Sequence, residues 1–300
     1  MFFDTHAHLD QEEFDADRSA VIERARQSGV ELILAVGIDL ASSRRAVRLA
    51  EDNADIFAAV GIHPNSAAEA HANDWDRIVE LAAHPRVVAI GETGLDRFRD
   101  YAPFPLQQEY FERHLTLARQ RDLPIVIHCR DAADDLMPML RRAAAHAGDC
   151  PDFPGTVAKR WSAKMGLSPY SDEAGGLSPF SSRPLKGVMH AFSGDARMAR
   201  ECVEMGLHVS FAGNVTYKNK KFQDLRLSAQ AVPLERMLVE TDSPYLVPEP
   251  LRGKERRNEP SYIAHAAQCL AKLREMPLAE LARQTTANAR GLFGISEKKS

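Results

Sequence analysis

Short, continuously apolar runs alternate along the chain with longer stretches in which apolar residues recur at helical spacing. The runs are rich in Val, Ile, Leu, Phe and Met, which is typical of parallel strands that helices bury on both faces. The predicted strands are residues 1–5, 31–36, 56–61, 87–91, 125–128, 187–190, 207–211 and 237–240. The predicted helices are residues 17–27, 41–52, 74–83, 105–121, 131–147, 196–205, 222–230, 260–274 and 278–292.

Eight strands, each followed by a helix, predict an α/β protein with a (β/α)8 TIM-barrel fold. The main alternative is an open, doubly wound sheet, which would gather its ligands at one switch point rather than around a ring. The 300 residues fit one barrel domain. Residues 148–186, with five prolines and five glycines, predict a long inserted loop. This loop is either a tolerated surface insertion or a lid that selects substrate.

Composition narrows the class of protein only slightly. Hydrophobic residues make up 44% and charged residues 27% of the chain, as in ordinary soluble globular proteins. The net charge of −4 argues against a general basic field for duplex nucleic acid, although a local basic patch remains compatible with it. No apolar run approaches the length of a membrane span, and the N-terminus does not resemble a secretory signal. Four scattered cysteines predict reduced thiols, so we expect a cytoplasmic protein.

Residues of the types that bind metals stand where the apolar runs end. His6 and His8 are two residues apart in the first predicted strand, so their imidazoles share one face. Alone, such a pair is more often structural than a metal site, and each other candidate could be a core histidine or a helix cap. The remaining candidates also follow predicted strands, and they are Glu92, His128, His190 and Asp242. In a closed barrel these strand ends meet on one face.

Four imidazoles and two carboxylates exceed the need of one catalytic metal, which takes about three protein ligands. They suit two divalent cations about 3.5–4 Å apart, with Glu92 as the bridging carboxylate. Asp242 is predicted to bind one cation and to act as general base on the water they share, which would become a metal-bridging hydroxide. Nitrogen and oxygen ligands without thiolate fit Zn, Mn or Mg, and the sequence does not choose among them.

The chain resembles the TatD family of metal-dependent hydrolases, described as deoxyribonucleases, within the amidohydrolase-like barrels. The motifs that carry the resemblance are Asp4-Thr5-His6-Ala7-His8, Gly61-Ile62-His63-Pro64, Gly91-Glu92-Thr93-Gly94-Leu95-Asp96, residues 124–130, His190-Ala191-Phe192-Ser193-Gly194, Glu240-Thr241-Asp242-Ser243-Pro244 and Arg257-Asn258-Glu259-Pro260. The resemblance implies one metal at His6, His8, Glu92 and Asp242, and another at Glu92, His128 and His190. It also implies that His63 contacts substrate, and that the enzyme hydrolyses phosphodiesters by 3′→5′ trimming of DNA ends.

The chain departs from the family pattern in its loops rather than at these ligands. Family members usually have a short connection in place of residues 148–186. Arg97-Phe98 replaces the aromatic pair that often follows Gly-Leu-Asp, and residues 252–257 carry additional basic residues.

Two basic clusters follow the seventh and eighth predicted strands, where barrels commonly bind phosphate. They are Lys218, Lys220 and Lys221, and Arg252, Lys254, Arg256 and Arg257. The alternative is that these are solvated loops. Arg257 and Arg130 are predicted to bind substrate, although Arg130 could instead pair with Asp131 or Asp134. The aromatic residues near enough in sequence to stack an unpaired base are Tyr217, Tyr245 and Phe192.

The predicted partner is therefore single-stranded DNA or another nucleic-acid end, without a membrane. The oligomeric state stays open, with a monomer as one option. An amide, ester or lactone hydrolase with the same two-metal site is the alternative function. A binding protein with a vestigial metal site is a third hypothesis, and the complete ligand set argues against it.

Overall fold

The computed structural model describes residues 1–145 and 185–296. All but the last two residues of the predicted insertion at 148–186 lie outside the described residues, as do Cys150 and Trp161. The assignment of residues 1–300 to a single domain with that insertion therefore stays a prediction.

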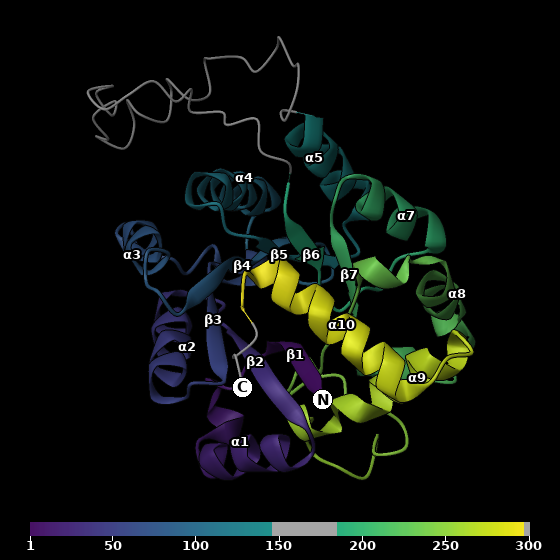
Figure 1. Cartoon of the computed structure of the whole chain (residues 1–300). Coiled ribbons are helices and arrows are strands. Elements are labelled where there is room, and N and C mark those ends of the chain that lie inside the picture. The colour runs from purple at the N-terminus through teal and green to yellow at the C-terminus, as the bar shows by residue number, and fades with distance from the viewer. Residues whose placement is uncertain (146–184, 297–300) are drawn as a thin grey trace.

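Eight parallel strands form one sheet in the order of the sequence, which confirms the predicted (β/α)8 barrel (Figure 1). The strands are β1 (Phe2–Ala7), β2 (Val30–Val36), β3 (Ile56–Val60), β4 (Val87–Asp96), β5 (Ile125–Arg130), β6 (Gly187–Met189), β7 (His208–Phe211) and β8 (Met237–Val239). All eight overlap predicted strands. β4 and β5 continue past their predicted ends, because Gly94 pairs with His128 and Asp96 pairs with Arg130.

Backbone hydrogen bonds close the ring between the segment after β8 and β1. The N–H of Asp242 donates to the carbonyl of His6 at 2.9 Å, and the N–H of His8 donates to the carbonyl of Ser243 at 2.8 Å. The Asp4 carboxylate accepts two further bonds across this seam, from Thr241 N at 2.9 Å and from Thr241 Oγ1 at 2.6 Å. An open doubly wound sheet is therefore excluded.

Helices surround the strands, as expected for parallel strands that are apolar on both faces (Figure 1). They are α1 (Arg18–Gln27), α2 (Leu40–Asp52), α3 (Asp74–Leu81), α4 (Phe104–Arg121), α5 (Ala133–Ala145), α7 (Ala196–Glu204), α8 (Gln223–Ala231), α9 (Ile263–Leu273) and α10 (Leu278–Phe293). Side chains cap two of them, since Asp39 accepts from Ser42 N and Asp195 accepts from Met198 N. None of the helices in the described residues is long and apolar enough to cross a membrane.

Apolar side chains fill the barrel interior at the end where the strands begin. They come from successive strands and include Phe3, Leu34, Ala59, Val126, Val188 and Leu238. α10 lies across this end, and the ring of its Phe293 packs 5.7 Å from that of Phe3. The polar residues predicted to carry chemistry are thus displaced to the opposite end, where the strands finish.

Candidate metal centre

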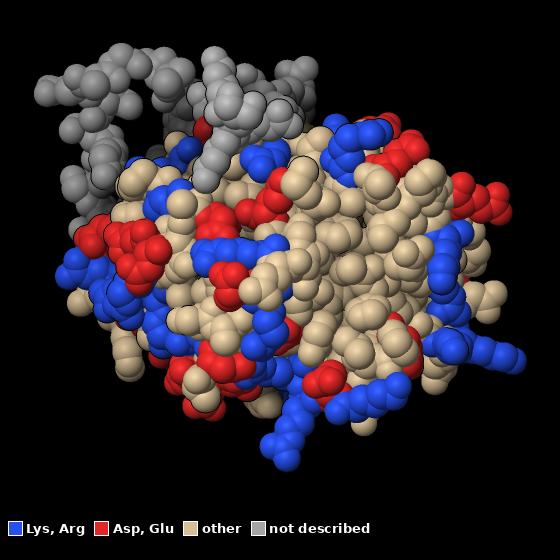
Figure 2. Space-filling model, turned by 60° about the horizontal axis from the view of Figure 1, so that its bottom comes forward, with Lys and Arg blue, Asp and Glu red and all other residues tan. Residues whose placement is uncertain are grey.

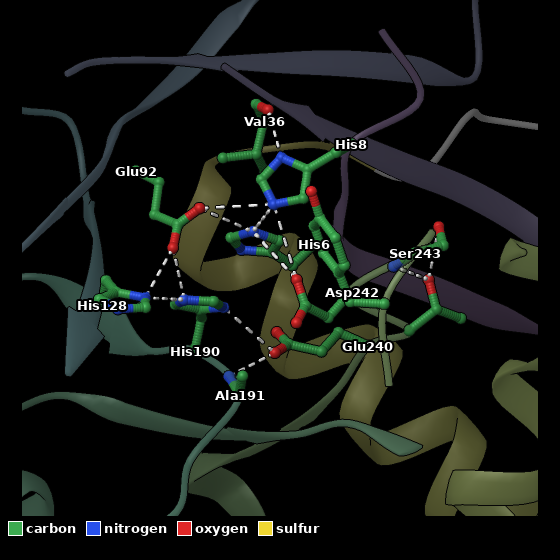
Figure 3. Close-up of polar contacts among 12 residues, drawn as sticks. His6, His8, Val36, Glu92, His128, His190, Ala191, Glu240, Asp242 and Ser243 are labelled. Atoms are coloured by element: carbon green, nitrogen blue, oxygen red, sulfur yellow. Dashed lines mark hydrogen bonds and ion pairs between the residues drawn. The ribbon is translucent and has the colours of Figure 1, made fainter. Parts of the chain in front are cut away.

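The six predicted metal ligands come together at the carboxyl ends of the strands (Figure 3). In chain order they are His6 in β1, His8 directly after it, Glu92 in β4, His128 in β5, His190 after β6 and Asp242 after β8. Except for the partly exposed His128, all are buried. Each lies in or just after a buried hydrophobic strand, so the packing of the barrel fixes the backbone that carries these side chains.

Glu92 lies between two pairs of imidazoles (Figure 3). Its Oε1 is 2.7 Å from His190 Nε2 and 3.0 Å from His128 Nδ1. Its Oε2 is 3.3 Å from His6 Nε2 and 3.5 Å from His8 Nε2. One carboxylate thus presents one oxygen to each pair, which is the arrangement expected of a bridging ligand.

Asp242 joins the pair formed by His6 and His8. Its Oδ1 is 3.6 Å from His8 Nε2 and 3.8 Å from His6 Nε2. Among the described residues, three groups place ligand atoms within 4.8 Å of one another: His6 with His8 and Asp242, His6 with Glu92 and His190, and His63 with Glu92 and His128. The group of His6, His8 and Asp242 lies within the first implied ligand set, whereas the other two groups join Glu92 to His6 and His190 or to His63 and His128, so the division of the ligands between two metals stays a prediction.

Polar contacts on the outer side of three imidazoles, hydrogen bonds for His8 and His128 and a longer ion-pair contact for His190, indicate which ring nitrogen faces the centre. His8 Nδ1 lies 2.9 Å from the carbonyl of Val36, which can only accept, so this nitrogen carries the proton. His128 Nε2 lies 3.1 Å from Asp96 Oδ2, and His190 Nδ1 lies 3.6 Å from Glu240 Oε1. Each contact leaves the lone pair of the other nitrogen directed inward, as in histidines that bind metal.

The inward nitrogens approach one another closely. His6 Nε2 and His8 Nε2 are 3.2 Å apart, and His128 Nδ1 and His190 Nε2 are 3.3 Å apart. Two lone pairs at such distances repel unless a proton or cation lies between them, so this donor set fits cations. Burial alone lowers the pKa of His8, but contacts with Asp242 and Glu92 raise it to about 9, which shows that the centre favours positive charge. The nitrogen and oxygen donors fit Zn, Mn or Mg.

His63 differs from His8, His128 and His190 because it turns a protonated ring nitrogen, rather than a lone pair, toward Glu92. Its Nδ1 accepts a hydrogen bond from Asn65 N at 3.0 Å, and burial lowers its pKa, so the neutral ring carries its proton on Nε2. That nitrogen lies 3.4 Å from Glu92 Oε1. His63 therefore offers an N–H donor rather than a lone pair. This geometry favours contact with substrate, and the predicted substrate role stays a prediction.

A cavity of about 580 Å³ opens above the centre. Five of the six ligands line it together with His63, and so do Asn65, Arg99, Tyr101, Arg130 and Tyr245. Arg130 thus stands where its predicted substrate role requires, with its guanidinium 3.8 Å from the ring centre of Phe98.

Arg257 does not line this cavity. Its Nη2 donates to both Asp17 carboxylate oxygens at 2.6 Å, and its guanidinium lies 4.6 Å from the Phe14 ring centre. It borders a separate hollow of about 790 Å³, shared with Lys254 and Arg256. The predicted role of Arg257 in substrate binding stays a prediction that this ion pair does not support. On the face drawn in Figure 2, basic and acidic side chains are interspersed rather than separated.

Two of the three predicted stacking residues are buried. Phe192 packs against Phe211, and Tyr217 donates its hydroxyl to the carbonyl of Val247 at 3.1 Å. Tyr245 alone is half exposed beside the cavity, with its hydroxyl 2.8 Å from Gln11 Oε1. The rings of Phe192 and Tyr217 are therefore inaccessible to any nucleic-acid base, paired or unpaired.

Two acidic residues were not assigned a role from sequence. Asp96 and Glu240 support His128 and His190 from outside the centre, and Glu240 also accepts from the N–H of Ala191. Both belong to the motifs quoted above, and each stands near a strand end. Glu240 in particular is two residues before Asp242, so the same alternation that identifies His6 and His8 could have identified it.

Comparison with known proteins places this arrangement in context. The family model for TatD related DNase matches residues 3–294. The "Uncharacterized metal-dependent hydrolase YabD" of Bacillus subtilis is 40% identical over 99% of this chain and 100% of the relative. The "3′-5′ ssDNA/RNA exonuclease TatD" of Escherichia coli K12 is 32% identical over 98% of this chain and 99% of the relative. The crystal structure of YjjV, a TatD homolog from E. coli K12, covers 98% of both chains with a TM-score of 0.80 and 28% identity.

Proposed function

Because the chain belongs to the family of TatD-related DNases, we propose that it is a metal-dependent phosphodiesterase that trims single-stranded DNA or RNA from the 3′ end. The observation that carries the proposal is the position of Glu92, with one carboxylate oxygen facing each pair of imidazoles. The names of curated relatives, metal-dependent hydrolase and 3′-5′ ssDNA/RNA exonuclease, support the same chemistry.

The proposed cofactors are two divalent cations. The first would be held by His6, His8, Asp242 and Glu92 Oε2, and the second by Glu92 Oε1, His128 and His190. When bound, such a pair lowers the pKa of a water molecule and stabilises the entering and leaving oxygens of a phosphoryl transfer.

The side chains of the centre would orient the phosphodiester and move one proton. Burial raises the pKa of Asp242, but the nearby imidazoles of His8, His6 and His190 lower it below its usual value. The carboxylate is therefore ionised and able to accept the proton of the attacking water. The Nε2–H of His63 would donate to a phosphate oxygen, and Arg130 would contact the phosphate from the cavity wall.

A cytoplasmic location is part of the proposal. Three cysteines in the described residues, Cys129, Cys202 and Cys269, form no disulfide, which fits a reducing compartment.

The test is hydrolysis of a 5′-labelled single-stranded oligonucleotide by protein that has been stripped with a chelator and reloaded with Zn, Mn or Mg. We expect products shortened one nucleotide at a time from the 3′ end, only in reloaded samples. Asp242→Ala should abolish release, whereas Leu227→Ala, an exposed change in α8, should behave as wild type. Full activity in folded Asp242→Ala, or in the stripped protein, would overturn the proposal.

The same samples should be assayed on amide, ester and lactone substrates. Turnover of these without release of nucleotides would replace the phosphodiesterase proposal with the alternative acyl hydrolase.

A further inference from the structure

Two aromatic rings project into solvent from the loop that follows β4. Phe98 is 54% exposed and Tyr101 is 61% exposed, although most aromatic residues of the described chain are buried. Tyr101 lines the cavity above the metal centre. Tyr101 and the neighbouring Phe98 therefore offer apolar ring faces beside a polar cavity, on which a flat aromatic group can stack.

Guanidinium groups accompany these rings. Arg130 lies 3.8 Å from the Phe98 ring centre, while Arg99 lies 5.2 Å from Phe98 and 5.6 Å from Tyr101. Arg99 and Arg130 both line the cavity, and neither forms an ion pair with a carboxylate in the part of the chain that the structure describes. Neighbouring Arg97, by contrast, is paired with Asp135 at 2.7 Å. The unpaired guanidiniums are therefore available to an anionic ligand such as phosphate.

Asp96 fixes this loop relative to the metal centre. Its Oδ1 accepts the backbone N–H groups of Phe98 at 2.8 Å and Arg99 at 2.9 Å, and its Oδ2 accepts from His128 Nε2 at 3.1 Å. One carboxylate thus connects the exposed rings with an imidazole that faces Glu92. The rings and the centre form a single preorganised surface.

We propose that Phe98, Tyr101, Arg99 and Arg130 form a subsite for one unpaired nucleotide, stacking its base on the rings and binding its phosphate through the guanidiniums. The inference rests on the proposed phosphodiesterase function and names the part of the protein that selects single strands. Every base has a π-face, so stacking tolerates sequence. Inside a duplex both faces of a base are covered by its neighbours, so an internal paired nucleotide cannot stack on these rings.

The test follows the logic of a double-mutant cycle: the aromatic rings are removed from the enzyme, the bases are removed from the substrate, and the two changes are made separately and together. The enzymes are wild type, the double variant Phe98→Ala/Tyr101→Ala, and Leu227→Ala, which truncates a side chain that is 48% exposed in α8 outside the cavity. The substrates are a single-stranded oligonucleotide and the same strand with stable abasic analogues at its two 3′-terminal positions. KM and kcat are measured for hydrolysis, and Kd is measured by fluorescence anisotropy.

On the normal strand, the double variant should show KM and Kd raised about tenfold, with a smaller effect on kcat, because the stacking of one base on the rings is lost. On the abasic strand, wild type and double variant should lie within about twofold, since the base that the rings contact is already missing. Equal losses on the two strands, or no loss on the normal strand, would overturn the subsite. Leu227→Ala should match wild type on both strands.

Replacement of Arg130 gives an independent readout. Arg130→Gln should raise KM on the normal and abasic strands alike, because both retain the phosphate, and should reduce the dependence of Kd on salt. Arg130→Lys should restore part of the affinity. An effect confined to the normal strand would contradict the assignment of Arg130 to phosphate.

The binding measurement separates failure of the subsite from failure of the proposed function. If metal-loaded wild type hydrolyses neither oligonucleotide nor bis(p-nitrophenyl) phosphate, but Kd shows the expected cycle, the phosphodiesterase proposal fails and the subsite stands. If wild type trims the strand but the double variant loses affinity equally on the normal and abasic strands, only the subsite is overturned. If wild type neither trims nor binds the strand, both are overturned.

Discussion

Asp96 Oδ2 accepts a hydrogen bond from His128 Nε2 at 3.1 Å, on the side of the imidazole away from Glu92. Burial raises the pKa of Asp96, but bonds from His128 and the N–H of Arg99 outweigh it and hold the pKa below its usual value. The ionised carboxylate therefore fixes the proton of His128 on Nε2 and leaves Nδ1 free to bind a cation.

Asp96→Asn should weaken metal binding by about 10–100-fold, the range found when outer partners of metal ligands are removed. Metal content after competition with a chelator of known affinity measures this. Asp135→Asn is the matched control, because Asp135 pairs with exposed Arg97 and not with a candidate ligand. Equal metal retention by the two variants would show that Asp96 does not support the site.

His63→Ala should reduce kcat/KM about 10–100-fold while leaving the metal content at the wild-type value. The reason is that His63 presents an N–H, whose hydrogen bond to a charged oxygen contributes about 1.5–3 kcal/mol, rather than a lone pair. His63→Gln, which retains a donor, should recover part of the activity. His128→Ala is the contrasting variant and should lose metal; a His63→Ala protein that also lost metal would make His63 a ligand.

Thr241→Val should lower the free energy of unfolding by about 1–3 kcal/mol, because it removes one of the two hydrogen bonds that Thr241 donates to the buried Asp4 carboxylate at the barrel seam. Valine keeps the shape and the strand preference of threonine, so the hydroxyl is the main loss. Urea denaturation followed by circular dichroism measures the change. Thr116→Val, on the exposed face of α4, should change stability by less than about 0.5 kcal/mol.

His114 should make the protein less stable in mild acid. Burial lowers its pKa to about 4, and its Nε2 accepts from Ile62 N at 2.9 Å, so the folded protein holds the ring neutral. The unfolded chain takes up a proton below about pH 6.5, the ordinary value for histidine. Stability from this residue is therefore complete above that pH and falls by about 1.4 kcal/mol per unit until the pH reaches the folded pKa.

Unfolding measured from pH 8 to pH 4 in wild type and His114→Gln checks this linkage. The variant should be less stable at pH 8, and the difference should shrink as the pH falls below about 6.5. A difference independent of pH would mean that His114 is protonated equally in the folded and unfolded states.

The alternation of strands and helices, and the ligand residues at the strand ends, could be predicted because both are local. A buried parallel strand is apolar at successive positions, so a histidine or carboxylate that ends one is conspicuous. Residues 92–96 were harder, because Gly94 and its polar neighbours resemble a loop. Pairing of Gly94 with His128 keeps them in β4, and no local pattern reveals that pairing.

The residues that contact the candidate metal ligands from outside the centre, and those that would bind substrate, were harder to predict from sequence. Their roles depend on contacts between distant parts of the chain. Arg257 was predicted to bind substrate, yet it pairs with Asp17 from the other end of the sequence. Phe192 and Tyr217 lie close in sequence to strand ends and basic clusters, but an aromatic residue there is equally suited to the core, where both lie. Phe98 stands among charged residues and gave no hydrophobic pattern, although its ring is exposed beside that of Tyr101.

α10 and the ring of Phe3 close the end of the barrel where the strands begin. A polymer therefore cannot thread through the molecule from one side to the other. If a nucleic-acid strand is the substrate, its terminus enters a blind pocket, and the released unit must leave through the opening that the rest of the strand still occupies.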